Sequence, residues 1–157
     1  MQIANVLHPS CVVLDLDAGD KEQILRSLAE PDAALRSDVD HDRLVSVLLE
    51  REQASSTAIA DGIAIPHGKI PLGEEVIAAF GRSSSGVDFD AVDGQPTRLF
   101  FLLVSPDSHP SLHLRWLAHI ASLLKSRAFR DDLLAAGSAT EVLERIGQEE
   151  QARSSEA

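Results

Sequence analysis

Cysteine, basic residues and long apolar runs are all scarce in this sequence of 157 residues. Cys11 is the single cysteine, which excludes an internal disulfide and a cysteine-based metal cage. No apolar run has the length that a membrane-spanning helix needs. Residues Met1 to His8 also lack the basic and apolar regions of a secretory signal. From these absences we expect a cytoplasmic protein with no direct membrane insertion.

The shortage of basic residues bears on the class of partner. There are 14 basic and 25 acidic residues, which gives a formal net charge of -11 at pH 7. A nucleic-acid binder needs a basic patch to neutralise phosphates, so we expect no nucleic acid among the partners. The acidic balance fits protein partners that are less acidic, and it fits equally well a charge that only maintains solubility.

The first third of the chain predicts an irregular lead, residues 1–18, and then two helices. Asp20 and Gln23 have the spacing of a capping box, and Pro31 should end the helix that they begin. Residues 31–39 read as a polar connection. A second helix is expected at 41–51, where apolar residues recur at helical spacing.

The middle of the chain predicts a β-hairpin. Two apolar runs, 57–60 and 63–66, flank Asp61-Gly62, and this dipeptide suits a type I′ turn, which needs positive φ at both central residues. Pro66 has no N–H to donate to a strand ladder, so pairing should end there and His67 should lie at the mouth of the sheet.

The remaining elements complete a single domain. After a turn at 71–75 we expect a strand at 75–82, a turn at 83–86, a loop at 87–96, a central strand at 99–104 and helices at 110–127, 128–136 and 138–146. Residues 1–147 therefore predict one α/β domain, with a mixed central β-sheet flanked by helices on both faces. Residues 148–157 predict a polar, disordered tail.

His67 is the first candidate for chemistry. A neutral imidazole is common near neutral pH and is able to attack phosphorus and hold a phosphoryl group as a phosphoramidate. A strand end, the adjacent Gly68 and a nearby helix N-terminus would fix the ring and supply donors for the phosphoryl oxygens. The alternative is an ordinary loop histidine beside a proline.

Further candidates lie elsewhere in the chain. His113 falls on an apolar stripe with Leu117, Ile120 and Leu124, so it is either a core histidine or a partner that orients His67. Arg51 ends a helix, where the helix dipole favours a cation, and it could also donate to phosphoryl oxygens. Hydroxyls of Ser55, Ser56 and Thr57 are either supporting donors or ordinary loop groups.

Two cation sites compete with this interpretation. His109 and His113 have the spacing of a helical metal pair, but Pro110 separates them and His119 lies about 120° further round the helix. Asp88, Asp90 and Asp93 alternate in a loop that lacks the glycine and late glutamate of an EF-hand. No phosphate-binding glycine loop and no nucleophile-elbow motif is present. We expect no metal and no cofactor.

The segment Ile63-Ala64-Ile65-Pro66-His67-Gly68-Lys69, preceded by Arg51-Glu52 and Ser56-Thr57, resembles a known active-site segment. It is similar to that of the fructose/mannitol-type enzyme IIA domains of the phosphoenolpyruvate-dependent sugar phosphotransferase system, above all the stand-alone nitrogen-regulatory enzyme IIA proteins. The resemblance covers nearly the whole chain, including Lys21, the Phe89-x-Ala91-x-Asp93-x-Gln95-Pro96 loop and His113-Leu114. Glycines are frequent in the family near Ala58 and Ala60, and we expect Asp61 to point outward here.

The resemblance implies both roles and partners. It implies that His67 is phosphorylated on Nε2, that His113 is the second active-site histidine, and that Arg51 closes the site. The implied donor is a histidine-containing phosphocarrier protein. The phosphoryl group then either controls regulatory target proteins or passes to a separate enzyme IIB for sugar uptake. The lack of an attached IIB or membrane domain favours regulation over uptake. The presence of His67, His113 and Arg51 disfavours a degenerate binder without phosphotransfer.

Overall fold

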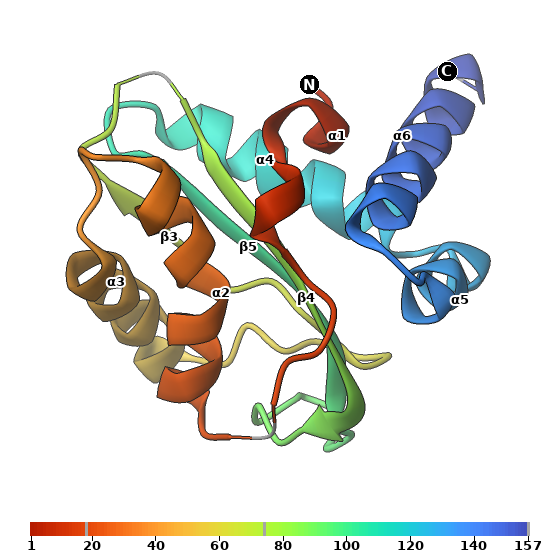
Figure 1. Ribbon diagram of the computed structural model, residues 1–157, viewed down its shortest axis with the longest axis horizontal. Coiled ribbons are helices and arrows are strands. Elements are labelled where there is room, and N and C mark those ends of the chain that lie inside the picture. Colours follow the sequence, from red (N-terminus) through yellow and green to blue (C-terminus); the bar gives the residue numbers. More distant parts are fainter. Residues whose placement is uncertain (18, 74, 157) are drawn as a thin grey trace.

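A five-stranded mixed sheet runs through the centre of the protein in the computed structural model (Figure 1). The structure describes residues 1–17, 19–73 and 75–156; Ala18, Glu74 and Ala157, which fall in the expected lead, the expected 71–75 turn and the expected tail, lie outside this description. The strands are β1 (Val12–Val13), β2 (Ile63–Ala64), β3 (His67–Ile70), β4 (Ile77–Val87) and β5 (Thr97–Pro106).

Strand β5 is the centre of this sheet. It pairs antiparallel with β4 on one side and parallel with both β2 and β3 on the other, and β1 pairs parallel with the far side of β4. The run 99–104 is fully buried, and Phe100 and Phe101 each make edge-to-face contact with another phenylalanine ring. The expectation of a central strand covered on both faces is therefore confirmed.

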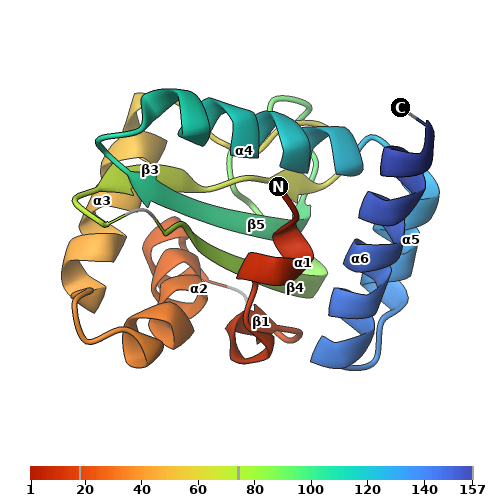
Figure 2. The same ribbon diagram turned by 90° about the horizontal axis from the view of Figure 1, so that it is seen from above.

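Helices cover both faces of the sheet, as expected. They are α1 (Ile3–Val6), the 3-10 helix η1 (Pro9–Cys11), α2 (Lys21–Leu35), α3 (His41–Ala54), α4 (Pro110–Leu123), α5 (Arg127–Ala135) and α6 (Ala139–Glu156). Figure 2 shows α4 over one face and α2 and α3 over the other, with α5 and α6 packed beyond one end. Among the described residues, no helix is both long enough and apolar enough to span a membrane.

The helices of the first third differ from expectation at their ends. The capping box of Asp20 and Gln23 begins α2 as predicted, but the helix continues through Pro31 to Leu35. Proline removes one hydrogen bond of the helix ladder. The helix continues because buried residues lie on one side of it both before the proline, at Leu28, and after it, at Asp32. Helix α3 also extends three residues past the expected end at 51.

The expected hairpin is present only in part. Asp61 and Gly62 have φ of 65° and 74°, which confirms the turn. The run 57–60 forms no strand and contributes a single bridge, whereas Ile63–Ala64 pairs with β5. Pairing does not end at Pro66, since its carbonyl still accepts from Leu103 N at 2.9 Å. His67 is the first residue of β3 and pairs with β5, so the expectation that pairing ends at Pro66 and leaves His67 at the mouth of the sheet is wrong.

Two other segments are more regular than expected. Residues 83–86 are no turn but part of β4, where the register with β5 shifts between Arg82 and Val87. The expected disordered tail forms the last turns of α6, which runs to Glu156. Its Glu150 is buried and accepts backbone hydrogen bonds from Ile3 N at 2.7 Å and Ala4 N at 3.0 Å. These hydrogen bonds anchor the end of α6 to α1. The sequence did not predict this order, because a contact between residues far apart in sequence leaves no local signal.

Candidate active site

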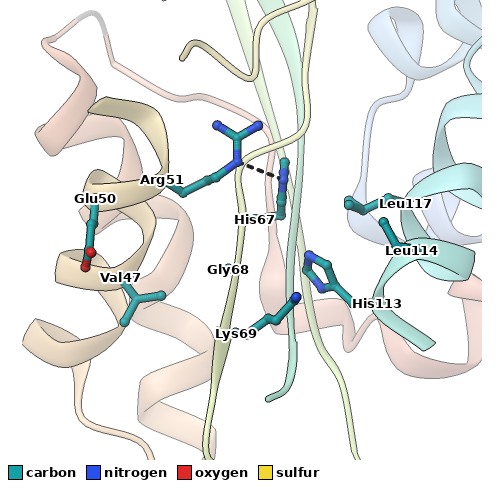
Figure 3. Close-up of a pocket in the computed structure, with 9 residues that line it drawn as sticks. All are labelled: Val47, Glu50, Arg51, His67, Gly68, Lys69, His113, Leu114 and Leu117. Carbon is teal, nitrogen blue, oxygen red and sulfur yellow. Dashed lines mark hydrogen bonds between the residues drawn. The ribbon is translucent and has the colours of Figure 1, made fainter. Parts of the chain in front are cut away.

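His67 lies where three elements converge. It is the first residue of β3 and stands opposite Leu103 of β5, with the end of α3 on one side and the start of α4 on the other (Figure 3). Its Nδ1 lies 2.6 Å from the carbonyl oxygen of Ile65, and its Nε2 lies 3.2 Å from Nε of Arg51. A carbonyl only accepts and a guanidinium only donates. The proton of the neutral ring therefore sits on Nδ1, and the lone pair sits on Nε2.

The surroundings of His67 favour this neutral form. Burial lowers the pKa of His67 below its ordinary value of 6.5. The hydrogen bond to the Ile65 carbonyl opposes that effect, and the positive charge of Arg51 adds to it. The ring therefore offers an unprotonated Nε2 near neutral pH, which is the state in which an imidazole acts as a nucleophile.

Arg51 is held in place from its own helix end. It stands in the last turn of α3, and its Nη1 donates to the carbonyl oxygen of Ser55 at 2.8 Å and contacts Ser55 Oγ at 3.4 Å. These bonds orient the guanidinium so that Nε faces His67, as the dashed line in Figure 3 marks. A guanidinium so placed is able to donate to an anion attached to Nε2.

His113 meets His67 from the opposite side. It lies in the first turns of α4, and the two ring centroids are 5.5 Å apart at an interplanar angle of 49°. The residue is only 4% exposed, and its Nδ1 lies 2.8 Å from Oγ of Ser105. Burial lowers the pKa of His113 to about 4, so this second ring is neutral near pH 7.

These groups line an open pocket of about 500 Å³. The residues around it are Val47, Glu50, Arg51, His67, Gly68, Lys69, His113, Leu114 and Leu117. Two cations, Arg51 and Lys69, face the pocket beside the histidines, while Leu114 is 67% exposed at its edge. The pocket thus combines donors for an anion with an apolar rim that another protein surface could cover.

The supporting residues expected from the sequence divide into two groups. Gly68 lines the pocket, and a Cβ added there would lie 2.7 Å from Cγ1 of Val47, so glycine permits the close approach of α3 to β3. Ser55 holds Arg51.

Ser56 instead donates to the carbonyl oxygen of Phe89 at 2.6 Å, and Thr57 is buried against Glu52. The structure therefore does not bring Ser56 and Thr57 into the pocket.

A partly buried ion pair, made by Lys21 and Glu52, was not singled out from the sequence. Glu52 is 4% exposed, pairs with Nζ of Lys21 at 3.0 Å and accepts from the backbone N–H of Thr57 at 3.0 Å. Lys21 also pairs with Asp90 at 3.1 Å and lies over the Phe89 ring. This cluster joins α2, α3 and the two loops that contain Thr57 and Asp90. Glutamate is normally exposed, so the sequence offered little reason to expect a buried Glu52. Its position next to Arg51 was the one available signal.

Four further residues at or beside the pocket were not predicted as site residues from the sequence: Glu50, Lys69, Ser105 and Leu114. Lys69 and Leu114 belong to the segments that carry the family resemblance and directly follow His67-Gly68 and His113, and that position was the available signal. Ser105 stands in a buried strand and has no sequence feature that marks it.

The rival cation sites do not form among the described residues. His113 binds Ser105, whereas His119 Nε2 lies 2.6 Å from Oε2 of Glu150. Asp93 accepts from the backbone N–H groups of Asp61 and Gln95. Within the part of the chain that the structure describes, no three histidine, cysteine or carboxylate residues gather as a metal site would require. Asp61 is exposed and lies outside the pocket, as expected.

Comparison with known proteins agrees with this geometry. A family model described as "Phosphoenolpyruvate-dependent sugar phosphotransferase system, EIIA 2" matches residues 5–149. A nitrogen regulatory protein of Bradyrhizobium diazoefficiens is 38% identical over 140 residues, which is 88% of this chain and 90% of that protein. The fructose-specific EIIABC component of Bacillus subtilis is 32% identical over 148 residues, which is 94% of this chain but 23% of that protein. The crystal structure of nitrogen regulatory protein IIA-Ntr from Neisseria meningitidis superimposes with a TM-score of 0.85 at 31% identity, over 92% of this chain and 98% of that one.

Proposed function

This chain belongs to the EIIA 2 family of the phosphoenolpyruvate-dependent sugar phosphotransferase system, and from that premise we propose that it carries a phosphoryl group on Nε2 of His67. The donor in this proposal is the phosphohistidine form of a histidine-containing phosphocarrier protein. The observation that carries the proposal is the bond from His67 Nδ1 to the Ile65 carbonyl, which leaves the Nε2 lone pair directed at Arg51.

The transfer needs no proton to move through the site. The Nε2 lone pair of His67 forms the new N–P bond while the N–P bond of the donor histidine breaks and returns its electron pair to the donor ring. A donor ring that is protonated on its other nitrogen leaves as a neutral imidazole. His67 keeps its Nδ1 proton, and the Ile65 carbonyl accepts from the cationic ring that results. Catalysis then rests mainly on positioning and charge stabilisation.

Three side chains would hold the phosphoryl oxygens. Arg51 would exchange its bond to the bare Nε2 for bonds to the oxygens, and Lys69 adds a second positive charge. His113 is close enough to contact the same group from the opposite side. The exposed Leu114 and the neighbouring Leu117 and Val47 would contact the donor protein.

We infer a regulatory role, in which the phosphorylation state of His67 controls target proteins. The nitrogen regulatory proteins in the comparison match this chain over nearly their whole length, which supports this choice. The second candidate is sugar uptake, in which His67 passes its phosphoryl group to a separate enzyme IIB. The similarity to part of the fructose-specific component of Bacillus subtilis supports that alternative. Either role places the protein in the cytoplasm, which suits the free thiol of Cys11.

Phosphorylation is tested by incubating the protein with phosphoenolpyruvate, enzyme I and the phosphocarrier, followed by intact-mass measurement. We expect one acid-labile phosphoryl group on the wild type and on His8→Ala, and none on His67→Ala. An adduct that persists on His67→Ala would overturn the proposal. Addition of a fructose-type enzyme IIB then separates the two roles, because rapid loss of the phosphoryl group to it would favour sugar uptake.

A further inference from the structure

Ser105 is a buried hydroxyl directly behind the candidate site. It belongs to β5, it is 0% exposed, and its Oγ lies 2.8 Å from Nδ1 of His113. In the sheet Ser105 stands opposite Lys69, two residues along from the pair of His67 and Leu103. Because alternate residues of a strand lie on one face, Ser105 and His67 occupy the same face of the sheet. Strand β5 therefore positions both His67, through its pairing with β3, and Ser105, the hydrogen-bond partner of His113.

The direction of the bond between Ser105 and His113 decides which nitrogen of His113 carries the proton. A neutral imidazole has one donor nitrogen and one acceptor nitrogen. If Nδ1 donated to Ser105, the buried hydroxyl proton would need another acceptor, and the described part of the structure gives its side chain the bond to His113 alone. If the hydroxyl donates to Nδ1, its proton is satisfied and the ring proton lies on Nε2.

The other side of the His113 ring faces the pocket. Figure 3 shows the ring directed toward His67, with one ring nitrogen at the edge nearest to it. A lone pair at that position would repel a phosphoryl group, whereas an N–H would donate to it. Since burial keeps His113 neutral, with a pKa of about 4, the ring acts through this single donor and not through a full positive charge.

We propose that Ser105 is a positioning residue, which donates to Nδ1 of His113 and so fixes His113 as the neutral Nε2–H tautomer that donates to the phosphoryl group on His67. The last step rests on the proposed phosphorylation of His67. The tautomer itself does not depend on it, because it is set by Ser105 and His113 in the free protein.

Two measurements test this inference. Long-range proton–nitrogen correlation NMR spectra of the free wild-type protein report the tautomer of His113, and we expect the proton on Nε2. The second measurement compares Ser105→Thr with Ser105→Val. The two introduced side chains are close in shape, and Val carries a methyl group where Thr carries the hydroxyl. We expect Thr to keep the Nε2–H tautomer and Val to give a mixture, and we expect Val to accept the phosphoryl group about tenfold more slowly than Thr.

The possible outcomes separate this inference from the function on which it depends. A wild type that is phosphorylated on His67 but carries the His113 proton on Nδ1 overturns the inference alone. Equal rates for the Thr and Val variants overturn it as well. A wild type that takes up no phosphoryl group overturns the proposed function, and the role given to the His113 donor falls with it. Even if both variants fail to fold, a wild-type His113 that carries its proton on Nδ1 would overturn the inference.

Discussion

Arg51 donates from Nε to Nε2 of His67 at 3.2 Å, so its guanidinium covers the nitrogen that would be phosphorylated. The bonds of Arg51 to Ser55 hold it there without a carboxylate partner among the described residues. Its charge is therefore not cancelled by an ion pair, and it remains available to an incoming anion.

The first prediction concerns the geometry of Arg51. Arg51→Lys keeps a positive charge but loses the planar fork and the bond to Ser55. We expect phosphorylation of His67 to slow by about a hundredfold, the usual cost of removing one positioned donor. Single-turnover mass spectrometry measures the rate, and Arg43→Lys, an exposed position on the same helix, serves as the control. A lysine variant as fast as the wild type would exclude a specific role for the guanidinium.

The second prediction concerns the pH dependence of His67. Its pKa is lowered chiefly by burial. An ordinary histidine is half protonated at pH 6.5, whereas the nucleophilic neutral ring of His67 should persist to lower pH. We expect the ability to accept a phosphoryl group to be constant through neutral pH and to fall only in more acidic solution. NMR titration of His67 in the free protein measures the pKa directly.

Arg51→Gln provides the matched comparison for this titration. Because the positive charge of Arg51 contributes to the low pKa, its removal should raise the pKa of His67. An unchanged titration curve in this variant would show that the guanidinium does not act on the ring.

The third prediction concerns the interaction of α3 with β3. Gly68→Ala would place a Cβ 2.7 Å from Cγ1 of Val47 and should push α3, and Arg51 with it, away from His67. We expect a loss of about 1–3 kcal/mol in the free energy of unfolding together with slower phosphorylation. Urea denaturation and the single-turnover rate measure the two effects. The double variant Gly68→Ala, Val47→Ala should recover much of both, and no recovery would count against a steric cause.

The fourth prediction concerns Asp32, a buried residue of α2 that faces Cys11 of η1. Its Oδ1 accepts from the Cys11 thiol at 3.3 Å, while Oδ2 is buried without a partner. Burial raises the pKa of Asp32 from 3.8 to about 6. A raised carboxylate pKa means that the protonated form stabilises the fold at acid pH, and that this contribution disappears as the pH rises through about 6.

Asp32→Asn tests this directly, because an amide does not ionise. The free energy of unfolding of the variant, minus that of the wild type, should increase by on the order of 2–3 kcal/mol as the pH rises from 4 to 8. Each tenfold change in proton affinity is worth about 1.4 kcal/mol. Urea denaturation across this range measures the difference. The exposed Asp15→Asn is the control and should show no such trend. A difference that does not vary with pH would mean that Asp32 is not buried in its charged form.

The fifth prediction concerns the contact between α1 and α6. Glu150→Gln replaces an acceptor oxygen by a donor facing the backbone N–H groups of Ile3 and Ala4. We expect the free energy of unfolding to fall by roughly 1–3 kcal/mol and these two amides to exchange faster with solvent. Hydrogen exchange and urea denaturation measure both effects. The exposed Glu144→Gln should change neither, and unchanged amide protection in Glu150→Gln would contradict the anchoring role.

The sequence predicted the elements whose signals are local. The apolar run of β5, the capping box of α2 and the turn at Asp61-Gly62 each depend on neighbouring residues, and all three are confirmed. The errors fall where distant contacts decide the outcome. Residues 83–86 have turn-like composition but belong to β4, at the irregularity where its register with β5 shifts, and the polar end of α6 is anchored to α1 through Glu150.

The site shows the same division. His67, Arg51 and His113 come together as the sequence led us to expect, although their roles stay predictions. Ser56 and Thr57 do not face the pocket, because their hydroxyls donate to the Phe89 carbonyl and to Glu52. Phe89 is distant in sequence and glutamate is normally exposed, so neither partner was predictable. Ser105 had no signal, since a serine in a buried strand becomes informative only when its neighbour across space is known.

The bond from Ile3 to Glu150 also has a consequence for synthesis of the chain on the ribosome. The two residues are 147 positions apart, so the backbone amide is synthesised long before the carboxylate that it binds. The central strand β5 and its partners β2, β3 and β4 are all complete before α6 emerges. Closure of α1 onto α6 is therefore a late step, and the N-terminal segment is left without its final partner while the rest of the domain is forming.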